Sequence, residues 1–328
     1  MPTATAPGKI ILFGEHAVVY GRPALAVPVT QVQASATIQK TGKFSGEKWA
    51  DSVLIQAPDI GLFSPLSRIQ AEHTTHPLDA VIQETFQRLG IARPPAFTLT
   101  IHSTIPVASG LGSGAAVSVA VIRALAALCN QTLSDEQVSQ IAYEVEKLHH
   151  GTPSGIDNTV IAYAKPVYFM RHLPSPAGGG AGGQIQTFNP ARPFHLVIAD
   201  TGIPAPTRES VGDVRKLWEV DKSRWEAVFD RVGGIVVEAR NAIESGDISR
   251  LGPLMDANHT LLQEMTVSSP ELDRLVLTAK NAGADGAKLS GGGRGGNMIA
   301  LVETENAPAV SDAILTAGAK KIIITQVG

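Results

Sequence analysis

A glycine-rich stretch, Pro106–Ala116, constrains this chain more than any other feature of its sequence. It follows an alternating apolar run, 97–101, and precedes a long segment, 113–128, with the apolar periodicity of a helix. This order predicts a strand, a tight turn and a helix. The glycines carry no β-carbon that would keep a ligand away from the backbone, and the N–H groups of a helix's first turn attract anions. The stretch is therefore typical of a phosphate-binding loop, although a tight turn without a ligand would look the same.

Two common phosphate loops fit this stretch poorly. The Walker pattern is absent, because no lysine follows the glycines. Gly110-x-Gly112-x-x-Ala115 matches a dinucleotide fingerprint loosely, but a Rossmann unit also needs a second strand with an acidic residue about 20 residues later. The acidic candidates, Asp135 and Glu136, follow Ser134, which predicts the N-cap of a helix. The sequence therefore argues against a nicotinamide-dependent dehydrogenase.

Composition narrows the class of protein further. The chain has 328 residues, enough for two domains, and 44% of them are apolar. With 27 basic and 30 acidic residues the net charge is −3 and no long basic run occurs, so we expect no binding to nucleic acid or to an anionic membrane. No signal-peptide pattern or membrane-spanning run is found, and the single cysteine, Cys129, predicts a small core residue. These features together predict a cytoplasmic protein.

Charged residues near the start of the chain are candidates for a site. The apolar strand expected at 3–13 contains Lys9 and runs into Glu15 and His16. A lysine beside a core strand needs a counter-charge or a ligand phosphate, unless it is a solvated lysine at a sheet edge. Glu15 and His16 either line a site or form a local hydrogen-bonded turn. Further extended runs are expected at 24–29, 32–38, 166–171 and 184–200.

Two carboxylates flank a predicted helix break. The capping box Ser134–Gln137 begins a helix that carries Glu146, and a glycine and a proline end it. Asp157 falls in the first turn of the next helix, so both carboxylates are candidates for one cleft. The alternative is that Asp157 only interacts with the helix dipole and Glu146 lies on the surface. The neighbouring His149 and His150 point in different directions on a helix and do not predict a metal pair.

The pattern changes near residue 190 to a second α+β segment of helices and alternating strands. A second glycine loop, 290–296, lies between two expected strands. It is a candidate to close over a phosphate, with Arg294 supplying charge, although a structural hairpin explains it equally well. The low-complexity run 174–183 predicts a hairpin tip.

Three separated motifs together resemble one family, the GHMP small-molecule kinases. The motifs are Pro7–His16, Pro106–Ala116 and Lys288–Gly296, and their order and spacing agree with the family over nearly the whole chain. Within that family, Gly14–Ala26 and His150–Asn158 are similar to the mevalonate kinases.

The resemblance implies an α+β GHMP kinase fold. An N-terminal ribosomal-S5-like α/β domain would span residues 1–190 and a C-terminal ferredoxin-like domain 191–328, with the active site between them. It also implies ATP-dependent phosphorylation of the primary C5 hydroxyl of mevalonate in isoprenoid synthesis, with Mg²⁺ as cofactor and a homodimer as the expected assembly. The alternatives are another kinase of the family, for phosphomevalonate or a sugar, and a non-catalytic member that binds a nucleotide or metabolite.

Roles transfer by resemblance to matching positions. Asp157 and Lys9 match catalytic residues, and Glu146 matches a metal-binding carboxylate. Ser113 is a candidate for the hydroxyl ligand of the metal. Glu15, His16, Asp157, Thr207 and Arg171 are the candidate substrate contacts. ATP would contact Pro106, Ser109, Gly110, Leu111, Gly112, Ser113, Gly114 and Ala115, and the third glycine loop comprises Gly291, Gly292, Gly293 and Arg294.

This chain departs from the family at two positions. The second serine that often ligates magnesium is Gly114 here, so either Ser113 or water would replace it. Arg294 stands where many relatives have small residues, and it is a candidate to contact a phosphate or the substrate carboxylate.

Overall fold

The computed structural model describes residues 1–42, 49–72, 76–106, 109–150, 155–171, 183–205 and 207–328. These residues form two compact units. Unit 1 comprises 1–8, 32–106 and 112–164, and unit 2 comprises 9–31, 107–111 and 165–328. Strands β1 (Thr3–Phe13) and β2 (Pro23–Gly42) contribute residues to both units. The family-domain boundary expected near residue 190 stays a prediction.

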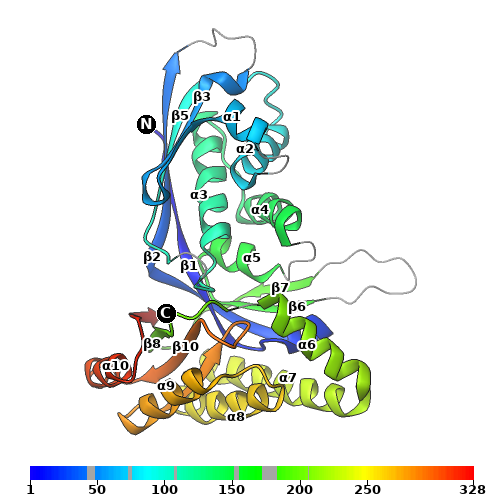
Figure 1. Ribbon diagram of the computed structural model, residues 1–328, viewed down its shortest axis with the longest axis vertical. Helices are drawn as coiled ribbons and strands as arrows, with labels where there is room; N and C mark the ends of the chain where they lie inside the picture. Colours follow the sequence, from blue (N-terminus) through cyan, green and yellow to red (C-terminus); the bar gives the residue numbers. More distant parts are fainter. Residues whose placement is uncertain (43–48, 73–75, 107–108, 151–154, 172–182, 206) are drawn as a thin grey trace. The chain divides into compact units, whose positions relative to one another are not determined.

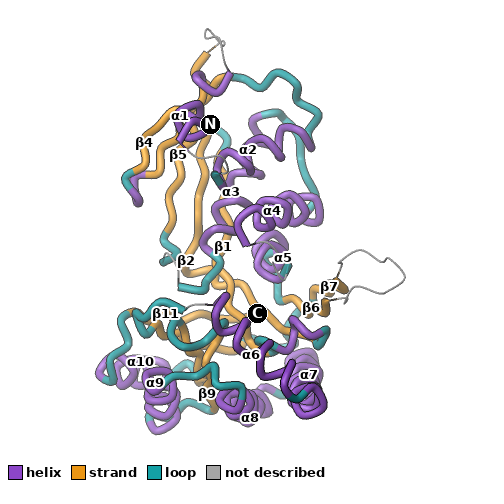
Figure 2. Tube along the Cα trace, turned by 45° about the vertical axis from the view of Figure 1, so that its right-hand side comes forward, coloured by secondary structure: helices purple, strands orange, loops and turns teal. Residues whose placement is uncertain are grey.

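Unit 1 is a mixed sheet covered by helices. The second half of β2 pairs antiparallel with β5, β5 pairs parallel with β3, and β4 pairs antiparallel with β3 at the edge. Helices α2 to α5 gather on one side of these strands, and α3 runs alongside them (Figures 1 and 2). The elements not yet given bounds are β3 (Val53–Ala57), β4 (Leu62–Pro65), β5 (Ala96–Ser103), α1 (Leu66–Glu72), α2 (Pro77–Arg88), α3 (Ser113–Leu128), α4 (Asp135–His150) and α5 (Ile156–Tyr163).

Local signals fix the helices of unit 1. Helix α3 has the predicted bounds, and it begins after Gly112, whose φ of 75° lies in the left-handed region that glycine tolerates. The capping box of α4 is confirmed: Gln137 N donates to Ser134 Oγ (3.2 Å), and Ser134 N donates to the Gln137 side chain (2.9 Å). The acidic residues that a Rossmann unit would need on a strand therefore lie in the first turn of a helix. Asn158 ties α5 to α4 by donating to Ser139 O (3.0 Å).

Unit 2 contains a four-stranded antiparallel sheet in the order β11-β8-β10-β9. The first half of β2 pairs with β6, and β6 pairs with β7. Its other elements are β6 (Val167–Arg171), β7 (Gly183–Thr187), β8 (Phe194–Asp200), β9 (Gly286–Ser290), β10 (Asn297–Val302), β11 (Lys321–Val327), α6 (Thr207–Val220), α7 (Lys222–Ser245), α8 (Leu251–Glu264), α9 (Pro270–Asn281) and α10 (Ala307–Thr316).

Three strand predictions differ in detail from the structure. The runs 24–29 and 32–38 belong to the single strand β2, because nothing between them breaks the extended backbone. The run 184–200 is two strands, β7 and β8, since the loop 188–193, which contains two prolines, separates them. The expected hairpin tip, 174–183, lies outside the described residues except for Gly183, the first residue of β7. Strands β6 and β7 pair antiparallel, as a hairpin requires.

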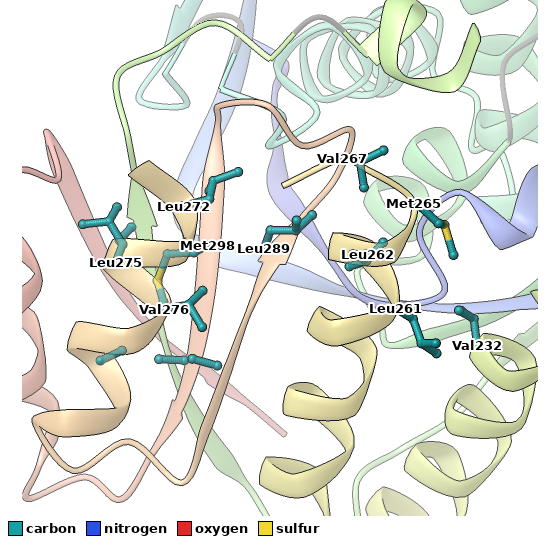
Figure 3. Packing of buried hydrophobic residues seen from close by; sticks show 14 of the residues in the cluster. Val232, Leu261, Leu262, Met265, Val267, Leu272, Leu275, Val276, Leu289 and Met298 are labelled. Atoms are coloured by element: carbon teal, nitrogen blue, oxygen red, sulfur yellow. The ribbon is translucent and has the colours of Figure 1, made fainter. Parts of the chain in front are cut away.

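One face of the four-stranded sheet packs on helices α8 and α9 (Figure 3). Because successive strand residues face opposite sides, Ala287 and Leu289 lie in this apolar layer and Lys288 points to the other face. The residues that build the layer include Leu261, Leu262, Leu272, Leu275, Val276, Leu289 and Met298. No helix within the described ranges combines the length and apolar character that a membrane crossing requires.

Helix α8 covers the free edge of β9. Asp256 Oδ1 accepts a hydrogen bond from Ala287 N (3.1 Å), and His259 Nδ1 accepts one from Leu289 N (3.3 Å). These two N–H groups have no neighbouring strand, and unpaired edge groups are a liability in a sheet. The helix approaches closely because Gly252 of α8 packs directly against Gly286 of β9.

This close approach gives a stability prediction with a matched control. A Cβ at Gly252 would lie 2.6 Å from the Asp285 carbonyl carbon, so we expect Gly252→Ala to lower the free energy of unfolding by about 1–3 kcal/mol. Gly234, exposed in the middle of α7, has open space around an added Cβ, and Gly234→Ala should raise that free energy by about 0.5–1 kcal/mol. Denaturant unfolding of both variants tests the pair, and a stabilised Gly252→Ala would contradict the packing.

Candidate active site

The first and third motifs meet in unit 2 through a buried ion pair. Lys288 Nζ on β9 contacts Glu15 Oε1, 273 residues away in sequence, and the side chains are 0% and 1% exposed. Lys288 also donates to Leu289 O (2.6 Å). Burial lowers the pKa of Lys288, and the Glu15 carboxylate opposes that shift. Glu15 Oε2 is buried and has no hydrogen-bond partner among the described residues, so it is an acceptor still available to a ligand.

Two further contacts join these motifs at alternate positions of the third. Ser290 Oγ donates to Ile11 O (2.7 Å), and His16 Nε2 lies 3.1 Å from Gly292 O. Residues 288, 290 and 292 therefore each hold part of the strand end and loop at 11–16. The third motif acts as the support on which the first motif rests.

His16 is a buried, neutral hydrogen-bond acceptor. A carbonyl can only accept, so Nε2 carries the proton that faces Gly292 and Nδ1 is left as an acceptor. Nδ1 has no partner within the described part of the chain. Burial lowers the pKa of His16 to about 4; the Gly292 bond opposes this, and the cations Arg294 and Lys288 add to it. At neutral pH the imidazole therefore suits a ligand group that donates, such as a hydroxyl.

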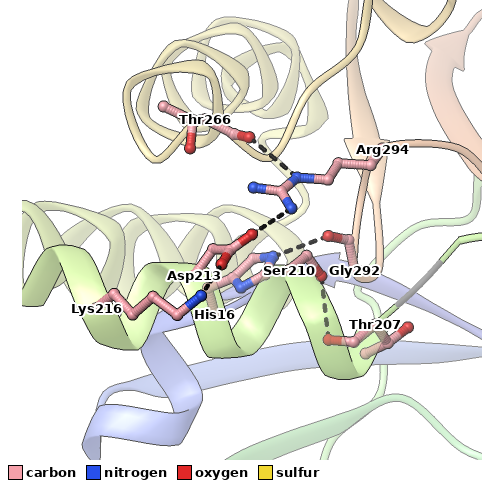
Figure 4. Close-up of polar contacts among 8 residues, drawn as sticks. All are labelled: His16, Thr207, Ser210, Asp213, Lys216, Thr266, Gly292 and Arg294. Carbon is pink, nitrogen blue, oxygen red and sulfur yellow. Dashed lines mark hydrogen bonds and ion pairs between the residues drawn. The ribbon is translucent and has the colours of Figure 1, made fainter.

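Glycine is required on both sides of this contact. Gly14 has a φ of 98°, and a Cβ there would lie 2.5 Å from Ala24 Cα. A Cβ at Gly292 would lie 2.7 Å from Thr207 Oγ1. The third glycine loop therefore packs directly on the first turn of α6, which brings Thr207 next to the loop that contacts His16 (Figure 4).

Arg294 is attached to α6. Its Nη1 lies 2.6 Å from Asp213 Oδ2, and its Nε donates to Thr266 O (3.4 Å), as Figure 4 shows. Asp213 also accepts from Lys216 (2.8 Å), and these two cations lower the pKa of its carboxyl. The guanidinium expected to reach a phosphate or a substrate carboxylate thus has an ion-pair partner on α6, and it fixes that helix to the third loop.

The centre of the second motif is bonded to the first motif and to Asn297, the residue that directly follows the third motif. Lys9 N donates to Leu111 O (3.0 Å), and the Asn297 side-chain amide donates to Ser109 O. Lys9 itself is 5% exposed, which excludes the alternative of a solvated edge lysine. Within unit 2 the first motif therefore contacts both the second and the third.

The remaining candidate residues belong mainly to unit 1. Ser113, Gly114 and Ala115 form the first turn of α3, while Glu146 on α4 and Asp157 in the first turn of α5 are half-buried on helices that pack together. A Cβ at Gly114 meets no described atom within 4 Å, so packing does not explain this departure from the family. Pro106 is the last residue of the unit 1 segment that contains β5. Unit 2 contains Gly110 in the loop of the second motif, Gly291 and Gly293 in the loop of the third motif, and Arg171 at the end of β6.

The histidine pair and the single cysteine are the other residues that the sequence singles out. The side chains of His149 and His150 lie outside the described residues. Within the described ranges no group of three or more His, Cys, Asp or Glu side chains is placed to hold a metal alone. Cys129 is half-buried at the C-cap of α3 rather than fully in the core, because the helix ends at Leu128.

Three residues that contribute contacts here, Lys288, Asn297 and Asp213, were not predicted from the sequence. For Lys288 a signal was present, because it stands between apolar strand residues and the argument applied to Lys9 holds equally there. No local pattern marks the other two, whose partners are distant in sequence.

We expect the buried ion pair to be strongly coupled in stability. Lys288→Met leaves Glu15 as an uncompensated buried charge and should lower the free energy of unfolding by about 3–5 kcal/mol. The double variant Glu15→Leu/Lys288→Met removes both charges and should recover most of that loss. Denaturant unfolding of both singles and the double measures the coupling; losses that simply add would contradict it.

His16 gives a pH prediction. Its folded pKa of about 4 lies below the ordinary 6.5, so the unfolded chain takes up a proton first as the pH falls. The stability contributed by neutral His16 is thus present above pH 6.5 and is lost between about 6.5 and about 4, by roughly 3 kcal/mol. The stability difference between wild type and His16→Gln, measured by denaturant unfolding, should shift by that amount across the window. Parallel pH curves would show that the imidazole is not held neutral.

Comparisons with known proteins agree with this assembly. The family descriptions "GHMP kinases N terminal domain" and "GHMP kinases C terminal" match residues 77–165 and 239–320. A mevalonate kinase of Pyrococcus abyssi is 33% identical over 336 residues, covering 98% of this chain and 94% of the relative.

Two solved structures are also similar. The crystal structure of L. major mevalonate kinase in complex with R-mevalonate is 30% identical, with a TM-score of 0.79, and covers 100% of this chain and 96% of that one. The Methanococcus jannaschii mevalonate kinase is 25% identical, with a TM-score of 0.78, and covers 99% and 96%. Motifs, fold and relatives agree, and this chain belongs to the GHMP kinase family.

Proposed function

We propose that this protein is a mevalonate kinase, which transfers the γ-phosphoryl group of ATP to the primary C5 hydroxyl of mevalonate and releases 5-phosphomevalonate and ADP. The observation that carries this proposal is similarity to mevalonate kinases along nearly the entire chain. The reaction belongs to isoprenoid synthesis.

The residues of unit 2 suit the substrate. Mevalonate carries two hydroxyls and a carboxylate, and the acceptors Glu15 Oε2 and His16 Nδ1 suit its hydroxyl donors. Thr207 packs on Gly292, whose carbonyl contacts His16. For the carboxylate we propose Arg171, because a guanidinium binds a carboxylate through two parallel hydrogen bonds and Arg294 already has a partner in Asp213.

Backbone amides of residues 109–115, together with Pro106, would contact the triphosphate, supported by the dipole of α3.

We propose Mg²⁺ as the metal, with Glu146 and Ser113 as protein ligands. A carboxylate and a hydroxyl are the hard oxygen donors that magnesium prefers, and a site completed by phosphate oxygens and water needs no protein cluster. When bound, the metal neutralises charge on the phosphates. Gly291, Gly292 and Gly293 would close the site from the third loop.

The protein's part in the reaction is mainly positioning and charge stabilisation. Asp157 would hold the C5 hydroxyl and accept its proton as the phosphoryl group arrives in line. Lys9, which is buried on β1, would offset the negative charge of the carboxylate and of the transferring group. No covalent phosphoenzyme is required. We also expect a homodimer located in the cytoplasm.

A coupled ADP-release assay with Mg-ATP tests the substrate directly. The panel is R-mevalonate, 5-phosphomevalonate, galactose and homoserine, and turnover is expected on mevalonate alone. Turnover on another alcohol would support kinase activity but contradict mevalonate as the substrate. No turnover on any of them, with an ATP analogue still bound, would favour a non-catalytic binding protein.

Asp157→Asn tests the proposed base. The amide keeps the size of the side chain but cannot take the proton, so kcat should fall by about 10²- to 10⁴-fold while the Kd of an ATP analogue is unchanged. Asp135→Asn is the control, since Asp135 forms a surface ion pair with Arg123 in the same unit and should leave kcat unaltered. Near-normal turnover of Asp157→Asn would remove Asp157 from this role.

A further inference from the structure

Asn297, which no motif singles out, contacts the phosphate loop. It is the first residue of β10, is 2% exposed, and its Nδ2 donates to Ser109 O, 188 residues earlier in the chain. Because a carbonyl oxygen only accepts, this partner fixes which end of the side-chain amide faces the loop. The contact is buried on both sides, since Ser109 is also buried.

The backbone of Asn297 is held on both flanks. It pairs with Asp200 of β8 and with Ser290 of β9 at the first rung of both ladders. The carbonyl of the preceding Gly296 accepts two hydrogen bonds from Thr201, one from its N (2.9 Å) and one from its Oγ1 (3.0 Å). A side chain on so fixed a backbone has a defined direction.

The bond to Ser109 O determines where the next N–H points. A trans peptide is planar, and its C=O and N–H point in opposite directions. No cis peptide occurs among the described residues, so with the Ser109 carbonyl turned toward Asn297 the Gly110 N–H is turned away from it. Gly110 has a φ of 78° and no side chain, so by itself this peptide is free to turn either way. The Asn297 amide selects one orientation.

We propose that Asn297 is a positioning residue for ATP: it fixes the Ser109–Gly110 peptide so that the Gly110 N–H faces the phosphate. This inference rests on the proposed kinase function. It also explains the rung that Asn297 shares with Ser290, because Ser290 holds Ile11 O of the first motif while Asn297 holds Ser109 O of the second. One pair of strand residues thereby sets both loops against the same sheet.

Two variants test the proposal. Asn297→Ala removes the donor, and the isosteric Asn297→Asp replaces it with a carboxylate that repels the Ser109 carbonyl. Without this donor the buried Ser109 carbonyl is unpaired and the Ser109–Gly110 peptide is no longer held in one orientation. KM(ATP) and the Kd of an unreactive ATP analogue should therefore rise about 10- to 100-fold in both variants. KM for mevalonate should stay at the wild-type value. Thermal unfolding of the unliganded variants reports whether each is folded.

The Asp variant adds a pH signature that a merely structural role would not produce. Burial raises the pKa of the introduced carboxyl, and once protonated it can donate to Ser109 O. Analogue binding by Asn297→Asp should therefore recover as the pH is lowered from 8 to 6, while the binding of wild type and Asn297→Ala should not recover.

Ser290→Ala is the matched control on the same rung, because it removes the bond to Ile11 O and leaves Asn297 in place. It should raise KM(ATP) less than either Asn297 variant. Wild-type analogue binding by both Asn297 variants, equal increases in the KM of both substrates, or no pH recovery would overturn the proposal. If wild type binds the analogue but does not phosphorylate mevalonate, the proposed function fails, and the analogue titrations still decide the role of Asn297.

Discussion

The buried pair of Glu15 and Lys288 is the interaction on which the rest of unit 2 depends. An ionised side chain left alone in an apolar interior costs several kcal/mol, and neither of these two reaches water. The loop that follows β1 must therefore lie on β9 wherever β9 forms. Once that contact is made, Ser290 reaches the backbone of Ile11, and His16 reaches the carbonyl of Gly292. The polar groups left over, Glu15 Oε2 and His16 Nδ1, are the ones suited to a hydroxylated substrate.

The third glycine motif has a structural task that its sequence does not reveal. Gly292 and Gly293 are glycines because Thr207 and the backbone of Val267 occupy the space of a side chain. Arg294, which stands among them, joins the loop to α6 through Asp213. The loop thus contacts α6 on one side and the loop of His16 on the other.

Local features of this chain were predictable, and long-range pairings were not. The bounds of α3 and the capping box of α4 followed from signals within a few residues. The fold and the family followed from three motifs. The partners of Lys288, Arg294 and Asn297 lie 273, 81 and 188 residues away, and no spacing rule specifies them. For Arg294 the sequence suggested a ligand, because a loop cation looks the same whether its partner is a phosphate or an aspartate.

Hydrogen–deuterium exchange on the wild-type protein, with R-mevalonate and an unreactive ATP analogue added separately, tests the central claim that the first and third motifs form one substrate site. We predict that mevalonate slows exchange in 14–21 and 290–296 together, because those segments share the Glu15–Lys288 and His16–Gly292 contacts. The ATP analogue should slow exchange in 109–116. Protection of one of the two mevalonate segments without the other, or of neither, would contradict the account.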